Sequence, residues 1–295
     1  MTLIVIAGPT ASGKTAAAIE LARKLDAEII SADSQQVYRH FDIGTAKPSP
    51  EELAAVPHHL LSCVDPLEPE FSAMRWSRLA DEAIVQLQKR GKRVIVAGGT
   101  GLYLRALLHG LVEAPSRDEA LRDELEAFAD AEGNEALHAR LAAVDPVTAA
   151  KHPAADRLRV IRALEIHTLT GKPASQHHEE HAFVPDRHPY ELFVITPPDR
   201  EALYAVINKR TQAMFDAGLV EETRALVAKG YREAAPMKAV GYVQALSVID
   251  GSMSVAEAIA DTAQATRHYA KRQLTWFRKE KGARAVTLQQ LLASF

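Results

Sequence analysis

One octapeptide near the start of the chain restricts its fold more than any other feature. Residues 8–15 read Gly-Pro-Thr-Ala-Ser-Gly-Lys-Thr and fit the pattern G-x-x-x-x-G-K-[ST] at every position. An apolar run, Leu3 to Ala7, precedes the octapeptide, and an Ala-rich run of helical character, Lys14 to Leu25, follows it. Because the motif requires this strand, loop and helix context, we interpret the octapeptide as a phosphate-binding loop, called the P-loop below.

The chemistry of phosphate binding explains the composition of the P-loop. Glycines let the backbone wrap around phosphate oxygens with its N–H groups pointing inward. A helix that begins near Gly13 adds the positive end of its dipole. Lys14 supplies a full positive charge, and the Thr15 hydroxyl is placed to bind Mg²⁺. We therefore expect phosphate groups to be held by Gly8, Pro9, Thr10, Ala11, Ser12, Gly13, Lys14 and Thr15, with Mg²⁺ as the cofactor.

Further apolar runs predict the rest of the core. They lie at residues 28–31, 93–97, 191–196 and 283–287, and a helical pattern covers 74–89. Short, nearly all-apolar strands that alternate with helices are typical of a parallel sheet covered on both faces. The predicted fold class is therefore α/β, a P-loop-type doubly wound parallel sheet.

The pattern changes between residues 115 and 186, where no strand is predicted. Helical patterns cover 119–131, 135–143 and 157–169. We expect an all-helical domain, 115–186, inserted into a core domain made of 1–114 and 187–295. The polar, His-rich tail at 176–188 is predicted to be a solvated loop or arm, with a metal site as the alternative.

Composition excludes several classes of protein. Cys63 is the only cysteine, so neither an internal disulfide nor a thiolate metal cluster can form. No signal peptide and no run long enough to span a membrane is evident, so a cytoplasmic protein is expected. The net charge of −3 gives no overall indication of a nucleic-acid partner.

Two further residues are candidates for the same site. Ligands of open α/β sheets bind at the carboxyl ends of the strands. Asp33 follows the second predicted strand, where it could bind Mg²⁺ or act as a general base; capping a turn is the alternative. Thr100 follows the strand at 93–97 and offers a hydroxyl at the same edge, or a helix cap. That strand ends without a carboxylate, which disfavours a motor or a switch GTPase.

Together with later segments, these residues resemble the tRNA dimethylallyltransferase (tRNA isopentenyltransferase) family. The most specific matches are Asp42-Ile43-Gly44-Thr45-Ala46-Lys47-Pro48 and Lys271-Arg272-Gln273 with Thr275-Trp276. Segments at 159–165 and 239–244 match as well, and the resemblance covers nearly the whole chain in the right order. Three departures put individual RNA contacts in doubt: the arm at 152–158 is one residue longer than usual, Leu158 stands where a polar residue is common, and Val243 replaces a basic residue.

The resemblance implies transfer of a dimethylallyl group from its diphosphate to N6 of adenosine 37, beside the anticodon of tRNA. It implies that Asp33 is the general base and that Thr100 is a hydrogen-bond partner near it. The P-loop would hold the diphosphate leaving group rather than ATP, with Arg210 as an additional basic contact. The partners are then dimethylallyl diphosphate and the tRNA anticodon stem-loop, and a monomer is expected.

The core and the helical insertion would grip the RNA together. A basic helix at 255–279 supports this, since seven Lys and Arg stand against one acid between residues 267 and 284. The expected tRNA contacts are Asp33, Ser34, Gln35, Gln36, Arg159, Arg162, Gly241, Tyr242, Arg267, Lys271, Arg272, Gln273, Trp276 and Arg278. Two alternatives stay open: a P-loop kinase, which would turn over ATP, and a non-catalytic RNA-binding protein that keeps a relic nucleotide site.

Overall fold

The computed structural model describes residues 2–68, 71–111, 115, 117–181 and 186–295. The chain divides into two compact units. The core unit comprises Met1–Leu108 and Asp186–Phe295, and the insertion unit comprises His109–Pro185. These divisions lie a few residues from the predicted ones at 114/115 and 186/187.

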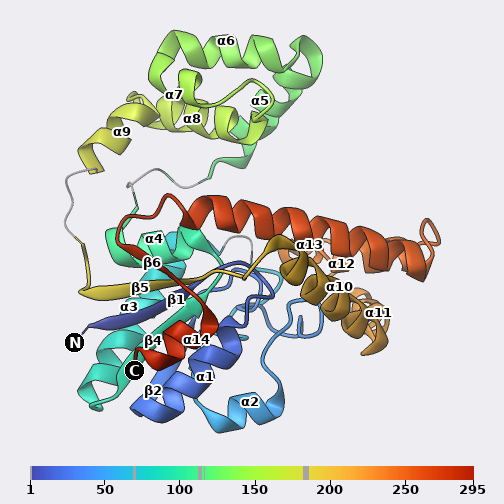
Figure 1. The fold of residues 1–295 in the computed structure, drawn as a ribbon. Helices are drawn as coiled ribbons and strands as arrows, with labels where there is room; N and C mark the ends of the chain where they lie inside the picture. Colours follow the sequence, from blue (N-terminus) through green and yellow to red (C-terminus); the bar gives the residue numbers. More distant parts are fainter. Residues whose placement is uncertain (1, 69–70, 112–114, 116, 182–185) are drawn as a thin grey trace. The chain divides into compact units, whose positions relative to one another are not determined.

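A parallel sheet forms the centre of the core unit (Figure 1). Over the described residues it has six strands in the order β3-β2-β4-β1-β5-β6, and every pairing is parallel. The strands are β1 Leu3–Ala7, β2 Ala27–Ser31, β3 His58–His59, β4 Arg93–Gly98, β5 Tyr190–Ile195 and β6 Ala283–Val286. The predicted doubly wound parallel sheet is therefore confirmed. Strand β3 was not predicted, because its two residues are not part of an apolar run.

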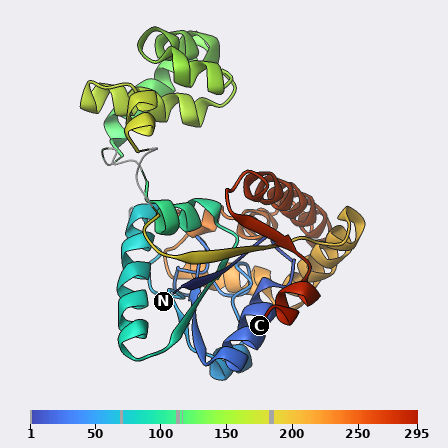
Figure 2. The same cartoon turned by 60° about the vertical axis from the view of Figure 1, so that its left-hand side comes forward.

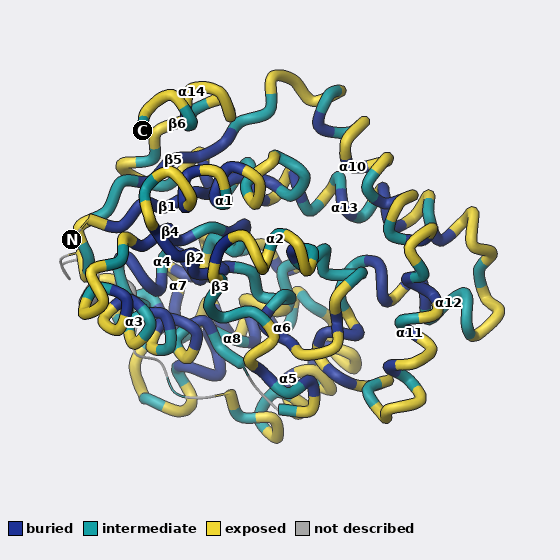
Figure 3. Tube along the Cα trace, turned by 90° about the horizontal axis from the view of Figure 1, so that it is seen from below, coloured by how far each residue is buried: buried dark blue, intermediate teal, exposed yellow. Residues whose placement is uncertain are grey.

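Helices cover both faces of this sheet (Figure 2). Alternate strand residues such as Ile4 and Ile6 pack with Leu21 and Leu291, which belong to helices α1 and α14. Helices α3 and α4 cover the other face, where Trp76 stacks on Tyr103 with ring centroids 4.8 Å apart. Strands β1 and β2 are buried at every residue, whereas the edge strand β6 is partly exposed (Figure 3).

The helices of the core unit are α1 Lys14–Leu25, α2 Pro50–Ala55, α3 Ala73–Lys89, α4 Gly101–His109, α10 Arg200–Asp216, α11 Leu219–Ala228, α12 Tyr242–Ile249, α13 Val255–Phe277 and α14 Leu288–Ala293. Helix α13 begins with a capping box, in which Ser254 and Glu257 satisfy each other's backbone N–H groups. It ends two residues before the predicted end at 279. Helix α14, which completes the cover over β5 and α1, had not been predicted.

The insertion unit consists of helices over its described residues. These are α5 Glu119–Glu132, α6 Asn134–Val144, α7 Pro146–Lys151, α8 Arg157–Thr170 and α9 Ala174–His181. They enclose an apolar core of their own, which includes Leu125, Leu137, Leu141 and Val160.

The prediction of a loop at 176–188 is wrong as far as His181, because α9 covers that stretch. Its first turn is anchored by buried Ala174 and by the Ser175 N–H, which donates to the Asp145 carboxylate at 2.9 Å. Of the rest of the predicted arm, residues 182–185 lie outside the described residues, and Arg187 and His188 both bond to the Asp81 carboxylate. Among the side chains that the structure describes, no group of three or more His, Cys, Asp or Glu could hold a metal ion. Nor is any described helix long and apolar enough to cross a membrane.

Candidate active site

The P-loop turns tightly between β1 and α1. Gly8 and Gly13 have φ angles of 145° and 86°, which favour glycine. Space gives a second reason for Gly8, since a Cβ there would lie 2.7 Å from the Ile195 carbonyl oxygen. Lys14 folds back over the loop and its Nζ donates to the Pro9 carbonyl at 2.5 Å. Burial lowers the pKa of Lys14 to about 8, with Arg210 adding to the effect and Asp33 opposing it.

A cavity of about 650 Å³ opens over the P-loop, and it is called the P-loop cavity below. Its walls come from the P-loop, from the turns after β2 and β4, and from helices α10 and α13. Residues from separate parts of the core unit line it together, namely Lys14 and Thr15 of the P-loop, Asp33 after β2 and Arg210 on α10. The predicted edge of the sheet is therefore where these side chains meet.

Asp33 and Thr100 lie on two adjacent turns that are tied to each other. The Asp33 Oδ1 accepts N–H groups of Gln35 at 2.8 Å and Gln36 at 3.3 Å. The Thr100 Oγ1 accepts the Ser34 N–H at 3.0 Å, and the hydroxyls of Ser34 and Thr100 are 3.4 Å apart. One oxygen of Asp33 thus caps its own turn, and among the described residues no hydrogen bond reaches its Oδ2. Thr100 supports the Asp33 turn instead of capping α4.

Arg210 brings a second cation to the P-loop. It lies on α10, and its guanidinium Nη2 donates to the Thr10 hydroxyl at 2.5 Å. Burial lowers the pKa of Arg210, while the nearby Asp33 carboxylate opposes this effect. A guanidinium remains charged in proteins, so it can pair with phosphate oxygens in a planar fork. Lys14 and Arg210 together make this end of the cavity suited to a diphosphate.

Gln273 on α13 ties two loops of the site together. It is 5% exposed, its Oε1 accepts the Thr10 N–H at 2.7 Å, and its Nε2 donates to the Gly99 carbonyl at 2.8 Å. Both functional groups of the side chain are therefore used within the protein. Although we predicted Gln273 as an RNA contact, the structure gives it the task of holding the P-loop against the turn after β4.

Trp276, another predicted RNA contact, packs at the junction of α4 and α13. A Cβ at Gly101 would lie 2.2 Å from its Nε1, and the Arg105 guanidinium lies 4.4 Å from the ring centroid. Arg105 also pairs with Glu280. The indole is half-buried by this packing.

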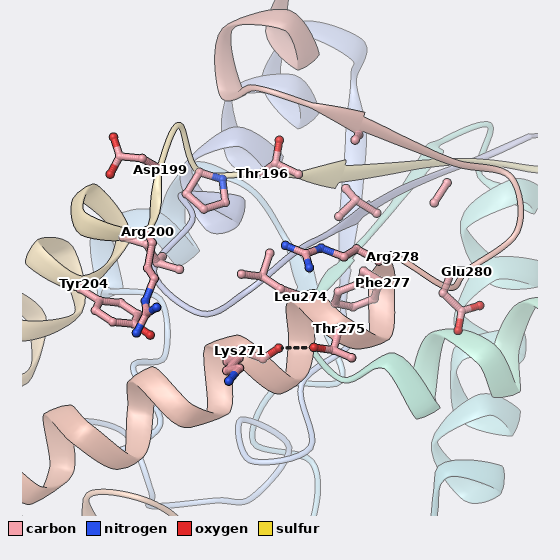
Figure 4. A pocket seen from close by; sticks show the side chains of 15 residues that line it. Thr196, Asp199, Arg200, Tyr204, Lys271, Leu274, Thr275, Phe277, Arg278 and Glu280 are labelled. Carbon is pink, nitrogen blue, oxygen red and sulfur yellow. Dashed lines mark hydrogen bonds between the residues drawn. The ribbon is translucent and has the colours of Figure 1, made fainter. Parts of the chain in front are cut away.

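The basic residues of α13 do not form one stripe. Arg272 faces the P-loop cavity with Gln273 and Tyr269. Lys271 and Arg278 instead line a second cavity of about 590 Å³, between α13, α10 and the strands β5 and β6 (Figure 4). Arg200 and Tyr204 of α10 share this second cavity, and in the described part of the chain neither Lys271 nor Arg278 forms an ion pair. Arg267 is held by a hydrogen bond of 2.7 Å to Asn208.

The remaining predicted RNA contacts differ in how much surface they present. Arg159 is exposed and forms an ion pair with Asp156 in its own helical turn. Arg162 donates to the buried Glu165 at 2.5 Å and to the Pro115 carbonyl at 2.9 Å, so its guanidinium is engaged within the insertion unit. Gly241 is buried, and Tyr242 is 0% exposed. In the core unit, Ser34, Gln35 and Gln36 line the P-loop cavity beside Asp33.

Several residues of the cavity carry no signal in the sequence. Thr262 and Thr266 of α13 line it, and the Thr262 hydroxyl is buried without a hydrogen-bond partner in the described structure. Glu222 of α11 lies outside the cavity and accepts hydrogen bonds from the loop at 42–47, which forms part of the cavity wall. An acid on an amphipathic helix resembles any solvated residue, so the sequence alone could not have identified it.

The oxygen ligands that the cavity offers suit a Mg²⁺ ion that is coordinated mainly by the phosphates of a bound substrate. Thr15 places an exposed hydroxyl there, and Asp33 adds a carboxylate. Mg²⁺ prefers oxygen ligands and usually keeps several waters while it bridges one or two protein groups to substrate phosphates.

The fold and the cavity define a class, that of P-loop α/β enzymes that hold a phosphorylated ligand beside a carboxylate. The chain belongs to the IPP transferase family, whose model matches residues 36–280. It is 65% identical to the tRNA dimethylallyltransferase of Myxococcus xanthus (strain DK1622), over 95% of this chain and 91% of that protein. It is 52% identical to the enzyme of the same name from Anaeromyxobacter dehalogenans (strain 2CP-C), over 96% and 93%.

Solved structures agree with these relatives. The full-length tRNA isopentenylpyrophosphate transferase from Bacillus halodurans is 38% identical, with a TM-score of 0.73 over 99% of this chain and 94% of that chain. A eukaryotic dimethylallyltransferase acting on tRNA is 28% identical, with a TM-score of 0.81 over 98% of this chain and 74% of that chain.

Proposed function

We propose that this protein transfers a dimethylallyl group from dimethylallyl diphosphate to N6 of adenosine 37 in the tRNA anticodon stem-loop. The observation that carries the proposal is one cavity that combines the P-loop, its two cations Lys14 and Arg210, and the Asp33 carboxylate. The names of the relatives support the same substrates. Because the core unit of a single chain forms the whole cavity, we expect the protein to act as a monomer.

The reaction breaks the C–O bond between the dimethylallyl carbon and the diphosphate and forms a bond from that carbon to N6. P-loop N–H groups, Lys14 and Arg210 hold the leaving diphosphate, where preorganised donors stabilise the developing charge. Thr15 would hold Mg²⁺ together with the diphosphate, and the bound ion would neutralise part of that charge. Asp33 accepts the proton that N6 loses, and the Thr100 and Ser34 turn keeps the carboxylate in place.

The reacting base must leave the RNA stack to enter the cavity, as enzymes that modify bases generally require. We infer that Arg272, exposed at the cavity, contacts backbone phosphates around the base, together with Lys271 and Arg278, which form no ion pair with a described residue. The insertion unit contributes Arg159, whose guanidinium is exposed. We expect the buried Tyr242 and Gln273 to affect RNA binding through the shape of the site and not through direct contact.

A transfer assay tests this proposal against the kinase alternative. Labelled dimethylallyl diphosphate, Mg²⁺ and an anticodon stem-loop with the target adenosine are combined, and a parallel reaction contains ATP and the same RNA. Label in the RNA without ATP is the expected result, and replacing the target adenosine by guanosine should abolish it. ATP turnover without prenyl transfer would contradict the proposal and support a kinase.

A further inference from the structure

A carboxylate outside the P-loop cavity holds one of its walls. The loop at residues 42–47 approaches α11, where Glu222 accepts N–H groups from three consecutive residues. The distances are 3.2 Å from Asp42, 2.9 Å from Ile43 and 3.3 Å from Gly44. The Tyr242 hydroxyl donates to the same carboxylate at 2.5 Å. Hydrogen bonds to an ionised acceptor are roughly twice as strong as neutral ones, so this cluster fixes the loop firmly.

Tyr242 makes the arrangement specific for glycine at position 44. The ring is fully buried, and a Cβ on Gly44 would lie 2.4 Å from it. The Gly44 N–H also donates to the Tyr242 hydroxyl at 3.1 Å. Burial and the Glu222 charge raise the pKa of Tyr242, so the hydroxyl stays protonated and remains a donor. The loop, α11 and α12 are thus locked at one point.

The locked loop in turn holds the turn that carries Asp33. Gln36 Nε2 donates to the carbonyls of Thr45 at 3.2 Å and Ala46 at 3.0 Å. The Gln36 backbone N–H donates to Asp33 Oδ1 at 3.3 Å. Glu222 is therefore linked to Asp33 through its hydrogen bonds to the 42–47 loop, the backbone of that loop and the hydrogen bonds of Gln36.

The cavity depends on this loop for part of its surface. Gly44, Thr45 and Ala46 line the P-loop cavity, as does Gln36, whereas Glu222 does not. Displacement of the loop would widen the cavity and release the amide group of Gln36. The effect of Glu222 on any reaction in the cavity must therefore be indirect.

We propose that Glu222 is a positioning residue for the transfer reaction, which holds the 42–47 loop and, through Gln36, the orientation of the Asp33 carboxylate. The inference rests on the proposed function for the role of Asp33. The P-loop is held separately from the 42–47 loop, by Gln273 and Arg210.

Three variants of the full chain test the proposal. Glu222→Ala removes the acceptor, Glu222→Gln keeps one of its two oxygens, and Glu221→Ala is a matched control for loss of charge on an exposed neighbour of the same helix. Tyr242→Phe adds a milder change that removes one donor and retains the ring packing. Two quantities are measured: hydrogen exchange of the backbone amides of residues 42–44, and steady-state transfer to the RNA.

For Glu222→Ala we expect faster exchange of these amides and a fall in kcat of about 10- to 100-fold, the order that small misplacements of reacting groups cost. The KM for the donor should stay within about twofold, because the P-loop is unaffected; a general loss of structure would change it. Glu222→Gln and Tyr242→Phe should lie between Glu222→Ala and the unaltered protein, and Glu221→Ala should match the unaltered protein.

Unchanged exchange in Glu222→Ala would overturn the proposal, as would faster exchange with normal kcat. A rise in donor KM equal to the fall in kcat would also overturn it, since the defect would then extend to the P-loop. Absence of transfer by the unaltered protein would instead refute the proposed function, and the exchange rates would still decide whether Glu222 holds the loop.

Discussion

At the scale of single residues, the chemistry of the site depends on one carboxylate with two different oxygens. Asp33 Oδ1 is occupied by the N–H groups of Gln35 and Gln36, and Oδ2 has no hydrogen bond from a described residue. An aspartate that only capped its turn would need the first oxygen alone. In the proposed function, Oδ2 is the oxygen that accepts the proton from N6.

Replacing Asp33 by asparagine separates these two roles. An asparagine retains the capping oxygen but cannot accept a proton, so we expect kcat to fall by about 10²- to 10⁴-fold, the usual contribution of a general base. Binding of the RNA, measured by fluorescence anisotropy, should change little. Asp26→Asn, at an exposed turn after α1, is the control and should behave as the unaltered protein. Near-normal turnover of Asp33→Asn would remove Asp33 from the role of base.

At the scale of elements, α4 and α13 meet with almost no space between them. Gly101 at the start of α4 lies against Trp276 near the end of α13, and Arg105 then reaches both Trp276 and Glu280. The same end of α13 positions Gln273, which holds the P-loop. The packing between α4 and α13 is therefore connected to the P-loop through Gln273.

We predict that Gly101→Ala disturbs this contact, because its Cβ would overlap the Trp276 indole. Overpacking of this kind costs about 1–3 kcal/mol of stability. Chemical denaturation should record the loss, and the donor KM should rise because Gln273 shifts with α13. Leu102→Ala, a change at the exposed neighbouring residue, serves as the control. Unchanged stability and donor KM in Gly101→Ala would show that the indole can move away at no cost.

Some elements could be predicted from the sequence, and others could not. Local signals identified the P-loop, the apolar strands and the start of α13, because apolar periodicity and capping residues act over a few positions. By contrast, β3 is only two residues long and polar, and it forms because β2 leaves an edge to pair with. The inward orientation of Gln273 depends on a partner 263 residues away. No local pattern contains that information. The sequence therefore led us to predict Gln273, which follows two basic residues of α13, as an RNA contact.

At the scale of the whole molecule, the insertion unit has a buried ionic centre of its own. Glu165 is buried within the helices and accepts hydrogen bonds from Arg122 at 2.8 Å and Arg162 at 2.5 Å, and from the Asp118 N–H. Burial alone would raise the pKa of Glu165, but these donors lower it to about 2. Together with the separate apolar core, this centre indicates that the unit can fold by itself.

We predict that a fragment of residues 109–185 unfolds cooperatively in urea and gives a helical circular dichroism spectrum. Since the pKa of Glu165 is lower in the folded state, its contribution to stability is present above pH 4.5 and is lost as the pH falls towards 2. The loss should be on the order of a few kcal/mol. Glu165→Gln should be less stable at neutral pH and should lack most of this dependence. A fragment without a cooperative transition would mean that the unit needs the core unit to fold.

The two hydrogen bonds of Gln273, to Thr10 and Gly99, have a consequence for folding during synthesis. Synthesis proceeds from the N-terminus, so the P-loop leaves the ribosome long before the helix whose glutamine holds Thr10 and Gly99. The edge strand β6 and helix α14, which cover β5 and α1, emerge later still. A nascent chain therefore carries its phosphate motif in an unfinished form through most of translation. In the proposed function, the P-loop is therefore held in its donor-binding arrangement only after α13 has been synthesised and has packed against it.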